Sequence, residues 1–421
     1  MNRMAFGIGK SSGIARALLA GITFVLPFAQ VCSATIHDRH HAVPVQTGLD
    51  VLESQKFAPL VGKRVGLITN HTGKDSQGRS AIEVLTHAAG VHLVALFSPE
   101  HGLRGLADEK ISSSKDNVTG LPVYSLYGET LRPTTDMLAG IDALVFDIQD
   151  AGVRFYTYTT TLAYCMEEAA KRHITFYVLD RPNPVGGKIV EGPVLDSDKT
   201  SFTAYAALPV RYALTIGELA QLFNIENGIH CDLHVIAMKN WHRRFFYDET
   251  GLPWIPPSPN LRTVTGAILY PGLEILQNAG VSVGRGTETP FEEFGAPWMN
   301  GEEVATRLND RNLAGLRFAA RSFTPAAGLY TGERCGGVAV QIPQGKDRGA
   351  VRSMLLGMEI ASVLHQLYPT HFDPAKLLVL VGNSETMAAL QAGDPPAKIV
   401  LGWSQKLAAF EKIRRKYLLY K

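Results

Sequence analysis

Residues 92–102 read HLVALFSPEHG, an apolar run that ends in a proline, a glutamate, a histidine and a glycine. Three more short apolar runs lie in the first half of the chain, at residues 64–69 (RVGLIT), 143–148 (ALVFDI) and 175–179 (TFYVL). The runs are continuous instead of alternating, which is typical of parallel strands covered on both faces. Helical patterns at residues 81–89 and 160–172 lie between them. This order predicts an α/β protein with a doubly wound, Rossmann-like parallel sheet.

The composition is that of a globular protein of two or three domains. The chain has 421 residues, 46% of them apolar and 19% charged, with 40 Gly and 23 Pro and no evident repeat.

Residues 1–34 have a basic start, an apolar run over residues 17–29 and a small-residue site that ends at Ala34, so we expect a signal peptide cleaved near Ala34. Removing it lowers the 41 basic residues to 38, against 39 acidic ones. We therefore expect a periplasmic or secreted protein that binds no nucleic acid and has no stable membrane association.

Three cysteines remain after the leader, namely Cys165, Cys231 and Cys335. Their number is odd, their spacing is wide and they form no C-x-x-C pair, which excludes a disulfide scaffold and a zinc ribbon. At most one disulfide can form, and we expect the cysteines to be small buried apolar residues.

A proline-rich segment, residues 251–260 (GLPWIPPSPN), predicts a rigid extended connector. Before it, residues 215–218 (TIGE) have the spacing of a capping box and predict a helix to about residue 223. We place a domain boundary just after the connector, which gives a Rossmann-like catalytic domain over residues 45–262 and a smaller mixed α/β domain over residues 263–421 that closes a cleft. In the second domain the patterns predict helices at 301–308 and 351–367, and strands at 337–342 and 377–381.

Ligands of open parallel sheets bind beyond the carboxyl ends of the strands, where the loops converge. The loops after the four predicted strands carry polar, ionisable or aromatic residues. Any one of them could be a cap or turn residue, but together they favour a site. The residues are Asn70, His71, Glu100, His101, Arg104, Gln149, Asp150, Arg154, Tyr156, Tyr158, Asp180, Arg181 and Asn183.

Glu100 is the strongest catalytic candidate in these loops. Pro99 restricts the chain before it, and a carboxyl group at a strand end under a second domain suits a general acid. A structural pair between Glu100 and Arg104 is the alternative. His101 could orient a substrate or bind a metal, but His71, Glu100, His101, Asp147 and Asp180 have no compact ligand spacing, and we expect no metal.

Several cofactor and enzyme classes are disfavoured. No G-x-G-x-x-G follows a strand, and neither a Walker loop nor a G-x-S-x-G elbow is present. We therefore expect no organic cofactor and no serine hydrolase.

Two motifs of the second domain stand out, at residues 270–274 (YPGLE) and 284–292 (GRGTETPFE). Arg285 between two glycines suits a carboxylate or a phosphate, although Arg285 and Glu288 could instead pair across a tight turn. Five aromatic residues that flank these segments could stack on a sugar or pack in the core: Tyr156, Tyr158, Trp254, Tyr270 and Trp298.

Taken together, the motifs resemble those of the NamZ-type exo-β-N-acetylmuramidases. The resemblance extends from about residue 47 to the end and rests on residues 48–52, 66–73, 97–105, 145–158, 179–184, 256–260 and 283–298. It implies a Rossmann-like domain, a smaller second domain and a cleft between them. It also implies a secreted or periplasmic glycosidase that removes terminal N-acetylmuramic acid from the non-reducing ends of peptide-free peptidoglycan fragments in cell-wall turnover. The glutamate proposed as catalytic in that family corresponds to Glu100.

The implied substrate requires two further groups. Muramic acid has a lactyl carboxylate, which Arg154 or Arg285 could bind. Glycoside hydrolysis usually needs a second carboxyl, for which the candidates are Asp150, Asp180, Glu191 and Glu288, unless the substrate's acetamido group is the nucleophile. A periplasmic protein that binds muropeptides without cleaving them, and a metal-dependent amidase or deacetylase, are the alternative functions.

Overall fold

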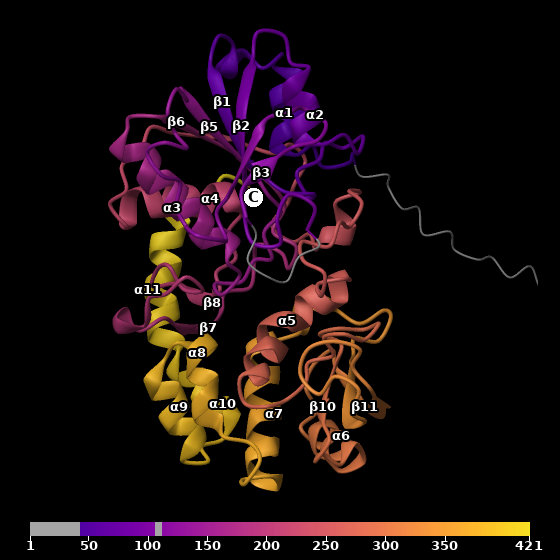
Figure 1. The fold of residues 1–421 in the computed structure, drawn as a ribbon. Coiled ribbons are helices and arrows are strands. Elements are labelled where there is room, and N and C mark those ends of the chain that lie inside the picture. Colours follow the sequence, from indigo (N-terminus) through magenta and orange to yellow (C-terminus); the bar gives the residue numbers. More distant parts are fainter. Residues whose placement is uncertain (1–42, 106–111) are drawn as a thin grey trace, which may run out of the picture. The chain divides into compact units, whose positions relative to one another are not determined.

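A seven-stranded sheet forms the centre of the first half of the chain (Figure 1). The computed structural model describes residues 43–105 and 112–421, so the predicted leader, residues 1–34, lies outside the described residues. The strand order is β3-β4-β2-β1-β5-β6-β9. The strands are β1 Arg64–Thr69, β2 His92–Ser98, β3 Ser114–Lys115, β4 Pro122–Ser125, β5 Ala143–Asp147, β6 Thr175–Leu179 and β9 Leu233–Ile236.

All neighbouring strands of this sheet are parallel except β3, which pairs antiparallel with β4. When the six parallel strands are numbered along the chain, their order in the sheet is 3-2-1-4-5-6, the order typical of dinucleotide-binding Rossmann folds. The predicted doubly wound sheet is therefore confirmed, as are its four predicted strands. The direction of winding reverses between β1 and β5, so the loops after β1 and β5 border the crevice where such sheets bind ligands, and the loop after β2 is the next one along the same edge.

Helices cover both faces of the sheet, as Figure 1 shows for α1 and α2 on one side and α3 and α4 on the other. Alternate residues of a strand point to opposite faces. Accordingly, Val65 and Leu67 of β1 belong to the core beneath α1 and α2, whereas Ile68 belongs to the core beneath α3 and α4. The helices are α1 Gly48–Ser54, α2 Ala81–Thr86, α3 Tyr158–Lys171 and α4 Ile216–Glu226. The predicted capping box is present, since Thr215 accepts from the Glu218 amide and Glu218 accepts from the Thr215 amide.

The second half contains helices and a three-stranded antiparallel sheet of order β10-β12-β11, which confirms the predicted mixture of α and β structure. A short antiparallel pair, β7 Glu191–Val194 and β8 Pro209–Arg211, precedes it in the chain. The elements of the second half are α5 Val264–Gln277, β10 Glu293–Ala296, α6 Gly301–Asp310, β11 Arg317–Phe323, β12 Cys335–Gln341, α7 Ser353–Leu367, α8 Leu378–Val381, α9 Ser384–Gln391, α10 Pro396–Gly402 and α11 Ser404–Arg414.

One predicted strand of this half is wrong. Residues 377–381 are helical, because Asp373 caps a turn that begins at Pro374 and continues into α8. Gly382 ends α8 with a left-handed backbone, φ 61°. Short apolar runs suit either a strand or a buried helix, and here the capping residues decide.

The three described cysteines are free and buried, as predicted. The predicted connector, residues 251–260, contains neither helix nor strand. No helix within residues 43–105 and 112–421 is long and apolar enough to cross a membrane.

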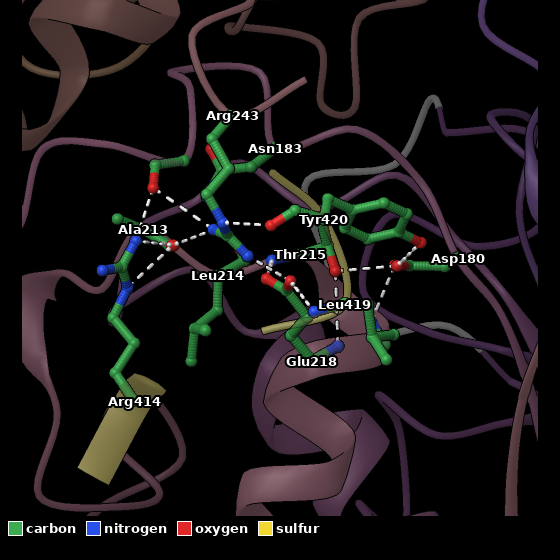
Figure 2. A network of polar contacts seen from close by, with 12 residues as sticks. Asp180, Asn183, Ala213, Leu214, Thr215, Glu218, Arg243, Arg414, Leu419 and Tyr420 are labelled. Atoms are coloured by element: carbon green, nitrogen blue, oxygen red, sulfur yellow. Dashed lines mark hydrogen bonds and ion pairs between the residues drawn. The ribbon is translucent and has the colours of Figure 1, made fainter. Parts of the chain in front are cut away.

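The C-terminal tail returns to the end of β6 and enters a buried polar network (Figure 2). The Tyr420 hydroxyl donates to Asp180 Oδ2 at 2.5 Å and accepts from the Met238 amide at 2.9 Å. The Leu419 amide donates to Glu218 Oε1 at 2.7 Å, and Arg243 pairs with the same carboxylate. The last residues of the chain are therefore part of the structure of the first half.

We expect Tyr420→Phe to lower the free energy of unfolding by about 1–3 kcal/mol, because it removes both hydrogen bonds of the hydroxyl and leaves the Met238 amide without a partner. The measurement is denaturant unfolding of the two proteins. Tyr417→Phe is the matched control, since its hydroxyl donates to the more exposed Glu226. An equal or larger loss in the control would contradict a special role for Tyr420.

The buried Asp180 predicts how the free energy of unfolding depends on pH. Burial, with a smaller contribution from the charge of Glu218, raises the pKa of Asp180 from 3.8 to about 7 although the Tyr420 hydroxyl bonds to it. The folded protein thus favours the protonated carboxyl, and this stabilisation is lost as pH rises from about 4 to about 7. In Asp180→Asn, the fall of the unfolding free energy over this interval should shrink by about 4 kcal/mol, measured by denaturant unfolding at several pH values. The exposed Asp136→Asn is the control, and an unchanged slope in Asp180→Asn would refute the assignment.

Candidate active site

The proline-rich connector is fastened to the carboxyl end of β1. The His71 ring lies 2.7 Å from the Pro256 carbonyl through Nε2, and the Tyr158 hydroxyl donates to the Pro257 carbonyl at 2.8 Å. Asn70 in turn donates to the Tyr158 hydroxyl at 3.0 Å. These bonds bring Asn70, His71 and Tyr158 together, as predicted from their places after the strands.

The turn after Glu100 is tight and close to His71. His101 has a positive φ of 68°, in the left-handed region that few residues other than glycine adopt. Gly105 has φ 69°, and a Cβ there would lie 2.0 Å from the His71 ring. Only glycine lets the ring occupy this position, which explains the second glycine of the S-P-E-H-G-L-R-G segment.

Glu100 itself is half-buried at the end of β2. Its Oε2 accepts from the Thr157 hydroxyl at 2.5 Å. Thr157 directly precedes α3, so the carboxylate is held between the loop after β2 and the start of that helix. Among the described residues Glu100 has no ion pair with Arg104, the alternative that the sequence left open. Arg104 instead lines two cavities, of about 890 and 450 Å³, the larger shared with His71 and the smaller with His101.

Aromatic rings connect the surroundings of Glu100 to the second half of the chain. Tyr158 meets Tyr156 edge to face at 4.9 Å between centroids, Tyr156 meets Tyr270 at 6.1 Å, and Tyr270 meets Phe291 at 4.7 Å. We call these four residues the aromatic cluster. Trp254 and Trp298 have other partners, since their indoles donate to the Arg262 carbonyl and the Tyr330 hydroxyl.

Beside the aromatic cluster, Arg285 binds Glu274. Its Nη2 donates to Glu274 Oε1 at 2.6 Å, and its guanidinium lies over the Phe291 ring, 5.3 Å from the centroid. The carboxylate partner is therefore Glu274 and not the exposed Glu288, which corrects the alternative of a pair across the turn. The Arg285 side chain is 28% exposed, so part of it faces solvent.

The Y-P-G-L-E motif fixes the position of Glu274. A Cβ on Gly272 of α5 would lie 2.0 Å from the Ser353 carbonyl of α7, so the two helices meet backbone to backbone. The Ser353 hydroxyl also donates to the Ile268 carbonyl at 2.5 Å. Sequence reasoning singled out this motif but did not assign Glu274, whose burial beside Arg285 appears only in the structure.

Asp150 lies near the same tyrosines and is buried. Its Oδ2 accepts from the Gly152 amide at 2.7 Å and from the Tyr212 hydroxyl, while Oδ1 has no hydrogen-bond partner within the described ranges. Burial raises the pKa of Asp150 to about 6 despite these bonds. The neighbouring Gln149 donates to the Pro182 carbonyl at 2.7 Å and helps to fix the loop.

Three predicted site residues have structural partners within the protein. Arg154 is 1% exposed, and its guanidinium donates to four backbone carbonyls, those of Pro193, Leu208, Leu380 and Val381. Burial lowers the pKa of Arg154 to about 9. Arg181 forms a buried ion pair with Asp147 at 2.6 Å, and Asn183 donates to the Leu214 carbonyl at 2.8 Å. The expectation that Arg154 faces the substrate is therefore wrong, because its side chain is buried and both terminal nitrogens already donate to main-chain oxygens.

Two carboxyl groups named as candidates also have structural partners. Glu191 pairs with Arg211 and accepts from the Met354 and Leu355 amides at the start of α7. Asp180 belongs to the network of the C-terminal tail. In the part of the chain that the structure describes, no three His, Cys, Asp or Glu side chains gather to hold a metal ion.

Comparisons with known proteins agree with this architecture. Two family models match the chain, "Exo-beta-N-acetylmuramidase NamZ, N-terminal" over residues 65–265 and "Exo-beta-N-acetylmuramidase NamZ, C-terminal" over residues 268–420. The peptidoglycan beta-N-acetylmuramidase NamZ of Bacillus subtilis (strain 168) is 42% identical over 381 residues, which cover 89% of this chain and 91% of that protein.

Two crystal structures of DUF1343 family proteins from Bacteroides fragilis NCTC 9343 are also similar. The first has a TM-score of 0.84 and 39% identity, covering 90% of this chain and all of its own. The second has a TM-score of 0.74 and 30% identity, covering 90% of this chain and 99% of its own. The sequence motifs, the sheet order and these matches agree, and the chain belongs to the NamZ family of exo-β-N-acetylmuramidases.

Proposed function

We propose that the protein is an exo-acting glycosidase that releases terminal N-acetylmuramic acid from the non-reducing end of peptide-free peptidoglycan fragments, with Glu100 as general acid. The observation that carries the proposal is the position of Glu100. It lies at the end of β2, one strand away from the point where the sheet reverses its winding, and Thr157 holds its carboxylate. The relative from Bacillus subtilis, named as a peptidoglycan beta-N-acetylmuramidase, supports the reaction class.

The aromatic cluster is buried, since each of its four side chains is at most 7% exposed, so it fixes the surroundings of Glu100 instead of offering a surface to a sugar. A general acid held in this way can protonate the glycosidic oxygen as the bond to the anomeric carbon breaks.

Arg285 is the group that we propose for the lactyl carboxylate of muramic acid. It is partly exposed and lies beside the aromatic cluster, whereas Arg154 is buried and its terminal nitrogens donate to main-chain carbonyls. A guanidinium oriented by a neighbouring carboxylate is suited to recognise a carboxylate ligand.

The setting of this reaction is part of the proposal. The leader predicted for residues 1–34 would export the enzyme, and we propose that it works in cell-wall turnover in the periplasm or outside the cell. Its partners are then peptidoglycan-derived saccharides.

The first test uses two disaccharides and the protein without residues 1–34. We expect release of free MurNAc from MurNAc-GlcNAc, no cleavage of GlcNAc-MurNAc, and at least a 100-fold lower rate in Glu100→Gln with an unchanged thermal unfolding midpoint. Mass spectrometry identifies the products. Saturable binding of MurNAc-GlcNAc without any product would support a binding protein instead. Full activity of Glu100→Gln would remove Glu100 from the reaction.

A second test separates Arg285 from Arg154. In Arg285→Gln we expect the dissociation constant of free N-acetylmuramic acid to rise about tenfold, while that of N-acetylglucosamine, which has no lactyl group, changes little. Isothermal titration calorimetry measures both. In Arg154→Gln we expect a loss of stability of about 3 kcal/mol or more, because buried carbonyls lose their donors. Equal weakening of both sugars by Arg285→Gln would argue against its role.

A further inference from the structure

Glu274 is a buried carboxyl whose second oxygen has no protein partner. It is 9% exposed, and Arg285 occupies Oε1 at 2.6 Å. Oε2 is inaccessible to solvent and accepts no hydrogen bond from any residue in the described ranges. Buried carboxylate oxygens are costly to leave unpaired, so such an oxygen points to a bound water or to a catalytic role.

A chain of contacting tyrosines leads from the helix that contains Glu274 to Glu100. It lies one helical turn after Tyr270 on α5, so both side chains are on the same face of that helix. Tyr270 contacts Tyr156, which contacts Tyr158 next to Glu100. Burial is the first cause of the raised pKa of Glu274, Arg285 opposes it, and the charge of Glu100 adds to it.

We propose that Glu274 is the second carboxyl of the glycosidase and acts as the general base that activates water. This inference rests on the proposed function. Glu100 donates its proton to the glycosidic oxygen as the bond from the anomeric carbon to that oxygen breaks. Water adds to the anomeric carbon, and its proton goes to Glu274. Solvent then returns one proton from Glu274 to Glu100, so the hydrolysis is balanced and the configuration inverts.

The environment of Glu274 suits a general base better than the environments of the other candidate carboxyl groups do. Arg285 favours its ionised form, while burial strengthens its affinity for a proton, and both properties suit a carboxylate that accepts a proton from water. Asp150 belongs to the same rim of the sheet as Glu100, and Tyr212 and Gly152 already hold its Oδ2. Glu274 comes from the second half of the chain, and two carboxyls from different halves are suited to flank a glycosidic bond.

The experiment compares two substrates, MurNAc-GlcNAc and 4-nitrophenyl β-N-acetylmuramide. Nitrophenolate leaves without much help from an acid, so Glu100→Gln should keep more activity on the aryl substrate than on the disaccharide. Glu274→Gln should lose at least 100-fold in kcat on both, and its pH profile should lack the fall at low pH that reports a base becoming protonated. Glu333→Gln, an exposed glutamate of the same half, should match the wild type.

Azide distinguishes a missing base from a damaged fold. Glu274→Ala with sodium azide should form the α-configured glycosyl azide at least ten times faster than it hydrolyses the aryl substrate without azide. A variant that failed to fold would form no azide product. Proton NMR of the wild-type reaction should show α-N-acetylmuramic acid as the first product.

Three results would overturn the assignment of Glu274: normal rates in Glu274→Gln, no azide product from a folded Glu274→Ala, or a β-configured first product. Each of them leaves the proposed function intact as long as the wild type cleaves MurNAc-GlcNAc and Glu100→Gln does not. Failure of the wild type to cleave either substrate would instead overturn the proposed function itself.

Discussion

The burial of the Arg154 guanidinium is the constraint on which the arrangement of the chain depends. A cation removed from water is costly unless it is hydrogen-bonded, and here four main-chain carbonyls accept from its two terminal nitrogens. One of them, at Pro193, belongs to β7, one at Leu208 directly precedes β8, and two, at Leu380 and Val381, belong to α8. One side chain that follows β5 thereby ties the sheet-forming half of the chain to the helical half.

The candidate site depends on this attachment because its groups come from both halves. The loops after the strands supply Glu100 and Tyr158, whereas α5 and the following loop supply Tyr270, Glu274 and Arg285. The connector is bonded to the strand ends through Pro256 and Pro257 and then leads into α5. These bonds hold the chain just before α5, and the contact of Gly272 with α7 fixes how the helix continues.

The sequence allowed the central sheet to be predicted because its strands are continuous apolar runs whose order leaves few topologies. It also pointed to Glu100, since proline and glycine bracket a carboxyl at a strand end. The role of Arg154 could not be predicted, because a buried arginine bound to carbonyls has the same sequence pattern as one that faces a ligand. Glu274 was not assigned for a related reason. The role proposed for it rests on its pair with Arg285, whose guanidinium lies over a ring of the aromatic cluster, and these residues are distant in sequence from Glu100. In residues 377–381, propensity alone could not separate a strand from a helix.

The contact between Tyr420 and Asp180 spans 240 positions of the chain. Contacts of such long range form late, because the loop that they close costs more conformational entropy than local structure does. Residues near position 420 are thus needed to complete the buried end of a strand made much earlier in synthesis. Until then, Asp180 and Glu218 lack partners that they have in the finished fold. A protein appended to Lys421 would begin beside this network, so a purification tag is better placed elsewhere.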